Sequence, residues 1–156
     1  MTCSSHTRLF AAATGGLLCA LLLAAGCGPS LPDTVPVRGK VTWKGKPLGN
    51  GTVVFQPQPG KIAEGLPERP ATGHLRPDGT FELTTFRAGD GAVPGVYDVA
   101  IHSYLSEPAA SDDDEHPSEY VWRIPPRYGD PSQTGLSVEV PAGDEFVEVA
   151  FEVQDE

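Results

Sequence analysis

Beyond residue 34 the chain alternates short apolar runs with clusters of glycine, proline and polar residues. The clearest run is near the end, where an apolar side chain stands at every second position from Val147 to Val153. That spacing is the period of a strand with one buried face. Runs of this kind, separated by turn residues, predict seven strands and no helix. The predicted strands are residues 35–43, 52–56, 71–75, 80–86, 96–102, 136–140 and 146–153.

The residues between the runs predict how the strands end and turn. Pro57 and Pro59 are expected to stop the second strand, because proline lacks the amide hydrogen that a central ladder requires. Asp78-Gly79 and residues 141–144 are expected to close hairpins, since glycine adopts positive φ at little steric cost.

Seven short strands joined by turns predict an all-β fold, an antiparallel seven-stranded sandwich, with a closed β-barrel as the competing architecture. Gly39 marks a bulge or a close approach of another segment, and a long irregular insertion is expected at about 103–135. Tyr97 is expected to bury its ring and to send its hydroxyl to the backbone. The candidates for the core are Trp43, Phe55, Phe81, Phe86, Val99, Ile101, Val149 and Phe151.

The first 27 residues follow a different pattern, that of an export signal. Arg8 precedes an apolar run at residues 17–23, and small residues lead up to Cys27. A cysteine directly after Ala-Ala-Gly is typical of a lipobox, in which the thiol receives a lipid and becomes the new N-terminus. An uncleaved transmembrane helix and a signal cut without lipid are the alternatives. Residues 9–25 fall short of the roughly 20 that usually span a bilayer.

These patterns divide the chain into three expected parts. Residues 1–26 form a lipoprotein signal peptide, residues 27–34 a lipid-anchored tether, and residues 35–156 one domain. Two of the three cysteines lie within the signal, and the third is Cys27. No disulfide is therefore expected in the mature chain, so its stability must come from apolar burial and sheet hydrogen bonds.

The charge balance narrows the choice of partners. The chain has 21 Asp and Glu against 11 Lys and Arg. Nucleic-acid binding is not expected, because it requires a basic footprint. No polybasic segment accompanies the signal, so acyl chains such as palmitate on Cys27 are the expected contact with the membrane.

Several motifs, met in a fixed order, resemble carboxypeptidase regulatory-like domains. They are residues 37–48, 52–55, 78–81 and 94–99. A narrower resemblance, to small uncharacterised bacterial lipoproteins built on that domain, is carried by residues 84–92, 124–128 and 132–136. The resemblance implies a transthyretin-like (prealbumin-like) sandwich. It implies no chemistry, because these domains resemble the non-catalytic appendage of carboxypeptidases.

Candidate catalytic residues are few. His74, His102 and His116 follow the signal, but no Gly-x-Ser-x-Gly nucleophile motif occurs, and the thiol of Cys27 is expected to carry lipid. Transthyretin-like hydrolases of 5-hydroxyisourate carry a C-terminal Tyr-Arg-Gly-Ser, whereas this chain ends in Val-Gln-Asp-Glu. We therefore expect no enzyme and no catalytic residue.

The acidic run at residues 112–115, followed by His116, is the candidate for metal binding. Calcium requires six to eight oxygen ligands, roughly, and its loops place them at alternate positions around a glycine turn. Consecutive acids point in different directions, so a solvated loop is the expected structure. No metal and no cofactor are predicted.

The segment around residues 120–128 is the candidate contact surface for a partner. Trp122, Arg123, Arg127 and Tyr128 are of the residue types that anchor interfaces. In the alternative, the aromatic rings fold the insertion back over the sandwich.

These observations together predict a non-catalytic, lipid-anchored module of the bacterial cell envelope, in the inner or outer membrane. Its expected work is structural or adhesive, through binding a protein or a glycan. The alternative function is a lipoprotein that binds a small solute or a metal.

Overall fold

The computed structural model describes residues 31–106, 121–143 and 145–155. The chain divides into two units, residues 1–31 and residues 32–156, and the second is the one described below. The predicted signal peptide and Cys27 lie outside the described residues. Within those residues, no helix has the length and apolar character needed to cross a membrane.

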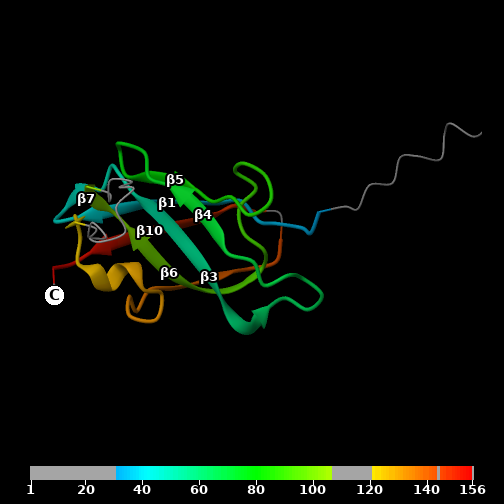
Figure 1. The fold of residues 1–156 in the computed structure, drawn as a ribbon. Helices are drawn as coiled ribbons and strands as arrows, with labels where there is room; N and C mark the ends of the chain where they lie inside the picture. Colours follow the sequence, from blue (N-terminus) through cyan, green and yellow to red (C-terminus); the bar gives the residue numbers. More distant parts are fainter. Residues whose placement is uncertain (1–30, 107–120, 144, 156) are drawn as a thin grey trace, which may run out of the picture. The chain divides into compact units, whose positions relative to one another are not determined.

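The second unit is all-β, as Figure 1 shows. It contains ten strands in the part that the structure describes. Two four-stranded sheets and one two-stranded ribbon account for them. The strands are β1 (Val37–Trp43), β2 (Lys46–Pro47), β3 (Thr52–Ile62), β4 (Ala71–His74), β5 (Thr80–Glu82), β6 (Gly95–His102), β7 (Tyr104–Ser106), β8 (Val121–Trp122), β9 (Ser137–Val140) and β10 (Val147–Val153).

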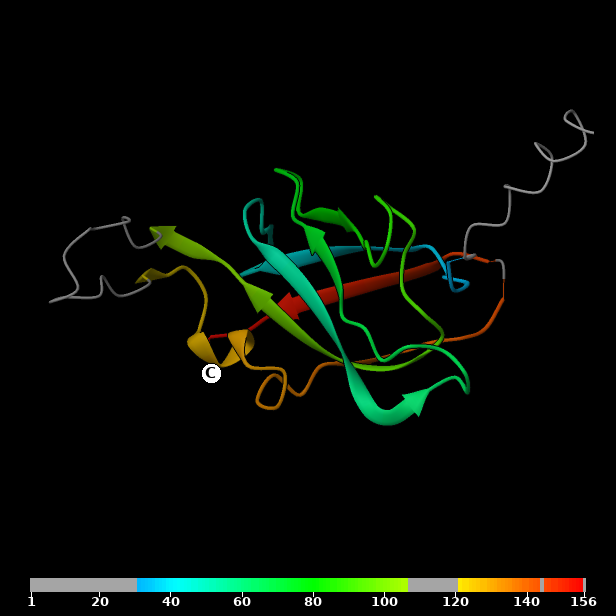
Figure 2. The same cartoon turned by 45° about the vertical axis from the view of Figure 1, so that its right-hand side comes forward.

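The first sheet is built around β1. β10 pairs with one edge of β1, and β2 and β5 share the other edge. β1 and β10 run in parallel, with Val37 opposite Val147 and Trp43 opposite Val153, and they lie side by side in Figure 2. The prediction of a wholly antiparallel arrangement is therefore wrong for this pair.

The second sheet has the order β4-β3-β6-β9, and all its pairs are antiparallel. The two sheets face each other across one hydrophobic core. Phe55 on β3 meets Phe151 on β10 with ring centroids 6.2 Å apart, and Phe81 on β5 stacks on Phe151 at 6.4 Å. These edge-on and offset ring contacts stabilise a core beyond the area that they bury.

Five of the eight predicted core residues are buried, two are half-buried against the core, and one lies outside it. Phe55, Phe81, Val99, Ile101 and Phe151 lie in the core cluster. Trp43 and Val149 are half-buried and pack against that cluster. Phe86 lies outside it and is half-buried, with the guanidinium of Arg69 over its ring at 5.3 Å.

The tyrosine prediction is confirmed. The ring of Tyr97 is fully buried, and its hydroxyl donates to the carbonyl of Val93 at 2.7 Å. The prediction for Gly39 is confirmed as a close approach and not as a bulge. The register of β1 runs unbroken through Gly39, and a Cβ there would stand 2.5 Å from the ring of Phe81.

All seven predicted runs contain strand, but β3 is longer than expected. It continues through Pro57 and Pro59 to Ile62. The neighbouring β4 pairs only with residues 52–55 of β3, so the rest of β3 lies at an edge on that side. Proline is tolerated there because no ladder partner requires its amide.

The first predicted hairpin is confirmed in part. Arg76 and Thr80 close the turn at Asp78-Gly79, but β4 then belongs to the second sheet and β5 to the first. The flanking segments do pair with each other, since Thr72 and Thr84 form an antiparallel bridge and exchange both backbone hydrogen bonds, at 2.9 and 2.8 Å. Burying Phe81 against both β1 and the core draws β5 to the opposite layer.

The second predicted hairpin is wrong. β9 pairs with β6 in the second sheet, and β10 pairs with β1 in the first, so the chain crosses between the sheets after Val140. The apolar face of β10, which the alternation predicted, is buried against the same core in this position.

The insertion is not irregular at its described ends. β7 and β8 form a ribbon in which Tyr104 faces Trp122, and a 3-10 helix follows at Pro126–Gly129. Ile124 and Tyr128 belong to the main core. The insertion thus folds back over the sandwich, as the alternative for this segment anticipated.

Candidate functional site

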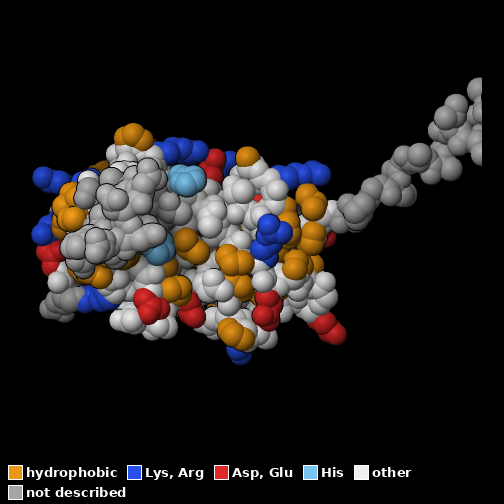
Figure 3. Space-filling view, in the orientation of Figure 1, with side chains coloured by type: hydrophobic (Ala, Val, Ile, Leu, Met, Phe, Trp, Pro, Cys, Tyr) orange, Lys and Arg blue, Asp and Glu red, His pale blue; other side chains and the backbone are white. Residues whose placement is uncertain are grey.

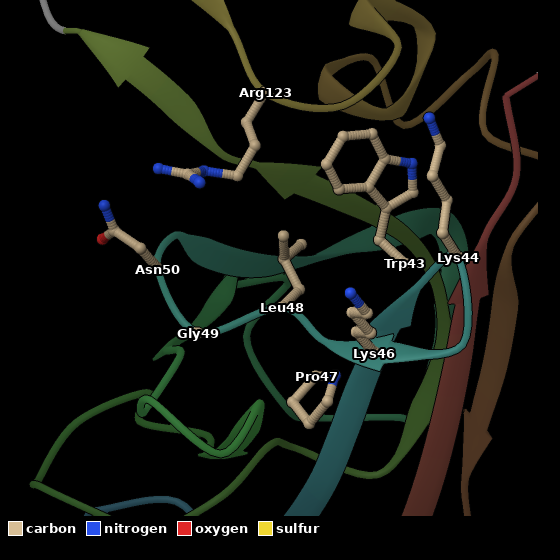
Figure 4. Close-up of a pocket in the computed structure, with 8 residues that line it drawn as sticks. All are labelled: Trp43, Lys44, Lys46, Pro47, Leu48, Gly49, Asn50 and Arg123. Atoms are coloured by element: carbon tan, nitrogen blue, oxygen red, sulfur yellow. The ribbon is translucent and has the colours of Figure 1, made fainter.

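A surface pocket lies where the β1–β2 hairpin, the loop after β2 and the residue after β8 come together. Its volume is about 500 Å³. Figure 4 shows that its lining comes from one stretch of sequence and a single residue far along the chain. The lining residues are Trp43, Lys44, Lys46, Pro47, Leu48, Gly49, Asn50 and Arg123.

The hairpin that carries four of these residues turns in two residues. Trp43 pairs with Lys46, leaving Lys44 and Gly45 at the tip with φ of 52° and 73°. Positive φ at both positions is the geometry of a type I′ turn, whose twist matches that of the flanking strands. Lys44 is the one described non-glycine residue with positive φ, a conformation that costs lysine more than glycine.

One carboxylate fixes the mouth of the pocket. Asp155 accepts a hydrogen bond from Nε1 of Trp43 at 3.0 Å and forms an ion pair with Lys44 at 2.8 Å. The ammonium of Lys44 also lies over the Trp43 ring, 4.7 Å from its centroid. The hydrogen bonds from Lys44 and then Trp43 lower the pKa of Asp155, so it stays ionised and holds both side chains.

The floor of the pocket is the loop after β2, and close backbone contacts hold it. Leu48 is buried, and its amide donates to the carbonyl of Val41 at 3.0 Å. A Cβ on Gly49 would stand 2.6 Å from the carbonyl oxygen of Pro77. Asn50 accepts a hydrogen bond at its backbone carbonyl from the hydroxyl of Ser103, which leaves its side chain exposed.

Arg123 closes the pocket from the side of the insertion. Its amide donates to the carbonyl of Ser103 at 2.9 Å, the same residue that holds Asn50. The Nε of Arg123 is buried and has no hydrogen-bond partner among the described residues. In Figure 4 the guanidinium extends across the pocket toward the side chain of Asn50.

The pocket is therefore cationic. Lys44, Lys46 and Arg123 line it, and Asp155 neutralises the first of them. Over the described part of the chain, no carboxylate forms an ion pair with Lys46 or Arg123. The acidic character of the whole chain does not extend to this surface.

The structure separates the four residues that the sequence grouped as a contact surface. Arg123 lines the pocket. Tyr128 is buried in the core, and its hydroxyl accepts a hydrogen bond from the amide of Gln154 at 3.1 Å, so its ring serves the packing of this unit. Arg127 lies over the Tyr128 ring and donates to the carbonyl of Gln154 at 3.3 Å.

Trp122 is half-buried and packs within the insertion. Its ring centroid lies 4.7 Å from that of Tyr104 and 6.0 Å from that of His102. A Cβ on Gly129 would overlap the Trp122 ring. These contacts show that the indole supports the fold of the insertion.

A second, smaller pocket of about 330 Å³ adjoins the first through Asn50 and contains both described histidines. His74 and His102 flank Thr52 on neighbouring strands, and the histidine side chains are visible on this face in Figure 3. Burial lowers the pKa of His102, so its ring is neutral near pH 7. Its Nδ1 lies 3.2 Å from the Tyr104 hydroxyl, while Nδ1 of His74 lies 3.4 Å from the Thr52 hydroxyl.

Neither pocket assembles the groups of a metal centre. No cluster of three or more His, Cys, Asp or Glu occurs in residues 31–106, 121–143 and 145–155. The acidic run at 112–115 and His116 lie outside these residues.

The comparisons with known proteins give no assignment. No protein-family model and no curated protein matches the chain. Among solved structures, the crystal structure of a 9R-lipoxygenase from Cyanothece PCC8801 is similar, with 14% sequence identity and a TM-score of 0.40. The similarity covers 78% of this chain and 16% of the lipoxygenase chain. A likeness this remote says nothing about the chemistry of this protein.

Sequence reasoning found Arg123 and missed its neighbours. Lys44, Lys46 and Asn50 stand in a run dense in turn residues, which predicts a loop and no more. The available signal was the accumulation of two lysines beside Trp43 in an acidic chain. The approach of Arg123 to this hairpin depends on tertiary structure.

Proposed function

We propose that this chain is a non-catalytic, lipid-anchored module of the bacterial cell envelope whose all-β body binds a protein or a glycan. The observation that carries the binding role is the pocket, where Lys46 and Arg123 have no carboxylate partner among the described residues. Anchoring rests on the sequence, in which Cys27 follows an apolar segment and a run of small residues.

We also propose that the body is a transthyretin-like sandwich of the carboxypeptidase regulatory-like kind. Seven of the ten strands fall on the predicted runs. The three others are short: β2 and β8 have two residues each and β7 has three. An experimental structure of the domain, compared strand by strand with transthyretin, tests this proposal.

Binding of a small solute is the second candidate, and the size of the pocket favours it. Ligand pockets in proteins usually enclose roughly 300–1,000 Å³. The pocket beside Trp43 measures about 500 Å³, which falls within that range. A solute held here would be an anion, because Lys46 and Arg123 line the pocket and have no carboxylate partner among the described residues.

Two experiments test the proposal. Mass spectrometry of the N-terminal peptide is expected to show acyl chains on Cys27, and Cys27→Ser is expected to release the protein from the membrane fraction. An unmodified thiol in a membrane-bound wild type would contradict the anchor.

For binding, the wild-type chain is immobilised from detergent and exposed to a solubilised envelope. A glycan or protein retained by the wild type and lost with the double variant Lys46→Gln/Arg123→Gln supports the proposal. A small molecule that copurifies with the wild type alone would favour the second candidate. Equal retention by both chains would place the binding surface elsewhere.

A further inference from the structure

The geometry points to a carboxylate-bearing saccharide, such as a uronic acid unit of an envelope polysaccharide, as the ligand of the pocket beside Trp43. This inference rests on the proposed binding function and specifies its ligand. Three features of the pocket carry it: an unsatisfied buried donor, a second free cation, and an aromatic ring beside an exposed amide.

The buried donor is Nε of Arg123. A buried polar group without a partner costs about 1–3 kcal/mol, and more when it is charged. The described residues give this nitrogen no acceptor, and the guanidinium extends into the pocket in Figure 4. A ligand that draws the guanidinium further into the pocket can give this nitrogen an acceptor. The planar fork of arginine favours a carboxylate, which it can engage with two parallel hydrogen bonds.

The second cation is Lys46. It is exposed, lines the same pocket, and forms no ion pair in the described part of the chain. Lys44 does not duplicate it, because Asp155 holds that ammonium at 2.8 Å. The pocket thus offers two cations that no carboxylate of the described residues neutralises, which is a strong bias in an otherwise acidic protein.

The sugar ring is assigned from Trp43 and Asn50. Trp43 is half-buried, and Figure 4 shows its six-membered ring directed toward Leu48 and Arg123. Asp155 holds the indole through Nε1, so the ring is oriented before a ligand arrives. An aromatic ring packs against the apolar face of a sugar, and the free amide of Asn50 can donate to and accept from hydroxyls.

The test uses the full chain in detergent micelles and titration calorimetry. The probes are the trisaccharides of galacturonic acid and mannuronic acid, each compared with its methyl ester. The ester keeps the ring and its hydroxyl groups and removes the charge, so it is a matched control for the ligand. Inorganic phosphate is a third probe, which separates recognition of a sugar from recognition of any anion.

We expect at least one acid to bind, its ester to bind about tenfold or more weakly, and salt to weaken the acid alone, because charge-assisted hydrogen bonds carry the difference. Arg123→Gln and Lys46→Gln are each expected to weaken the acid about tenfold and to leave its ester unchanged. Lys46 is exposed and contributes little to folding, so its variant stays informative if Arg123→Gln unfolds. Lys61→Gln, on β3, removes an exposed charge outside the pocket and is expected to change nothing.

Three results would overturn the inference. Equal affinity for the acid and its ester would show that the pocket does not recognise the carboxylate, although it would still bind a glycan. Phosphate that binds as tightly as the acids would show that the pocket recognises anions in general and makes no use of the sugar ring. Binding of neither acid would overturn it altogether, and the envelope retention experiment would then decide separately whether the broader binding function stands.

Discussion

At the residue scale, the core is packed closely enough that adding or removing one atom of a buried side chain is expected to change the stability of the protein. The hydroxyl of Tyr97 donates to the carbonyl of Val93 within the core, and burial raises the pKa of Tyr97 to about 12. Both facts were foreseeable from the residue type and its strand, because a tyrosine in the core needs a backbone partner. A substitution at Tyr97 therefore tests both how much this hydrogen bond stabilises the core and how that stabilisation depends on pH.

Tyr97→Phe is expected to lower the free energy of unfolding at pH 7 by about 1–3 kcal/mol, because the Val93 carbonyl loses its donor. The raised pKa favours the neutral phenol in the folded state. This contribution is complete below pH 10.0, the ordinary pKa of tyrosine, and is lost as the pH rises toward about 12. Urea titrations of both chains from pH 8 to 12 measure it. A difference between them that stays constant over that interval would contradict the assignment.

Gly39 tests the close approach of β1 to β5. Gly39→Ala places a methyl group 2.5 Å from the Phe81 ring and 2.6 Å from Val149, and overpacking of this kind costs about 1–3 kcal/mol. The double variant Gly39→Ala/Phe81→Leu is expected to lose less stability than the two single variants summed, since the smaller side chain makes room. Denaturant unfolding of the four chains measures this coupling. Strict additivity would show that the Phe81 ring is not the reason why position 39 requires glycine. Lys40→Ala, at an exposed position on the same strand, is the neutral control.

At the scale of the elements, the pattern predicted where strands form but not their partners. Alternation along β10 identifies the face that is buried, and both sheets bury such faces against the same core. Turn residues at 78–79 and 141–143 fit a hairpin and a crossing between sheets equally well. The partner is decided by tertiary packing, as for Phe81, and local sequence does not encode it. Pro57 and Pro59 misled for a related reason, since only the extent of β4 shows that this part of β3 is an edge.

The ribbon of β7 and β8 is the element whose packing is tested most directly. Trp122→Ala is expected to lower stability by about 1–3 kcal/mol, because the indole fills the space against Tyr104, His102 and Gly129. Thermal unfolding of the full chain in detergent measures the loss. Val121→Ala, the exposed neighbour on β8, is the matched control and is expected to stay within about 0.5 kcal/mol of wild type. A Trp122 variant as stable as the control would return this residue to the list of partner contacts.

At the scale of the whole molecule, the sequence predicted that Arg123 belongs to a contact surface but did not predict that residues 43–50 lie beside it. The pocket joins residues 43–50 to Arg123 through Ser103, which bonds to both Asn50 and Arg123. No local pattern connects segments this far apart, whereas the order of the sheets brings them together. The charge of the site was hidden for the same reason, because two lysines and an arginine become a cationic surface only after folding.

The core formed by the described residues lies within residues 32–156, which gives the last prediction. All buried hydrophobic residues of the described chain belong to this unit, from Val35 to Val153. A chain of residues 32–156 is therefore expected to fold by itself and to unfold in one cooperative transition, with a Tm close to that of the full chain in detergent. All three cysteines precede residue 32, so a reducing agent is expected to leave the Tm unchanged. Circular dichroism and calorimetry of the two chains measure both effects. A short chain that unfolds without a cooperative transition would show that residues 1–31 supply packing that this body needs.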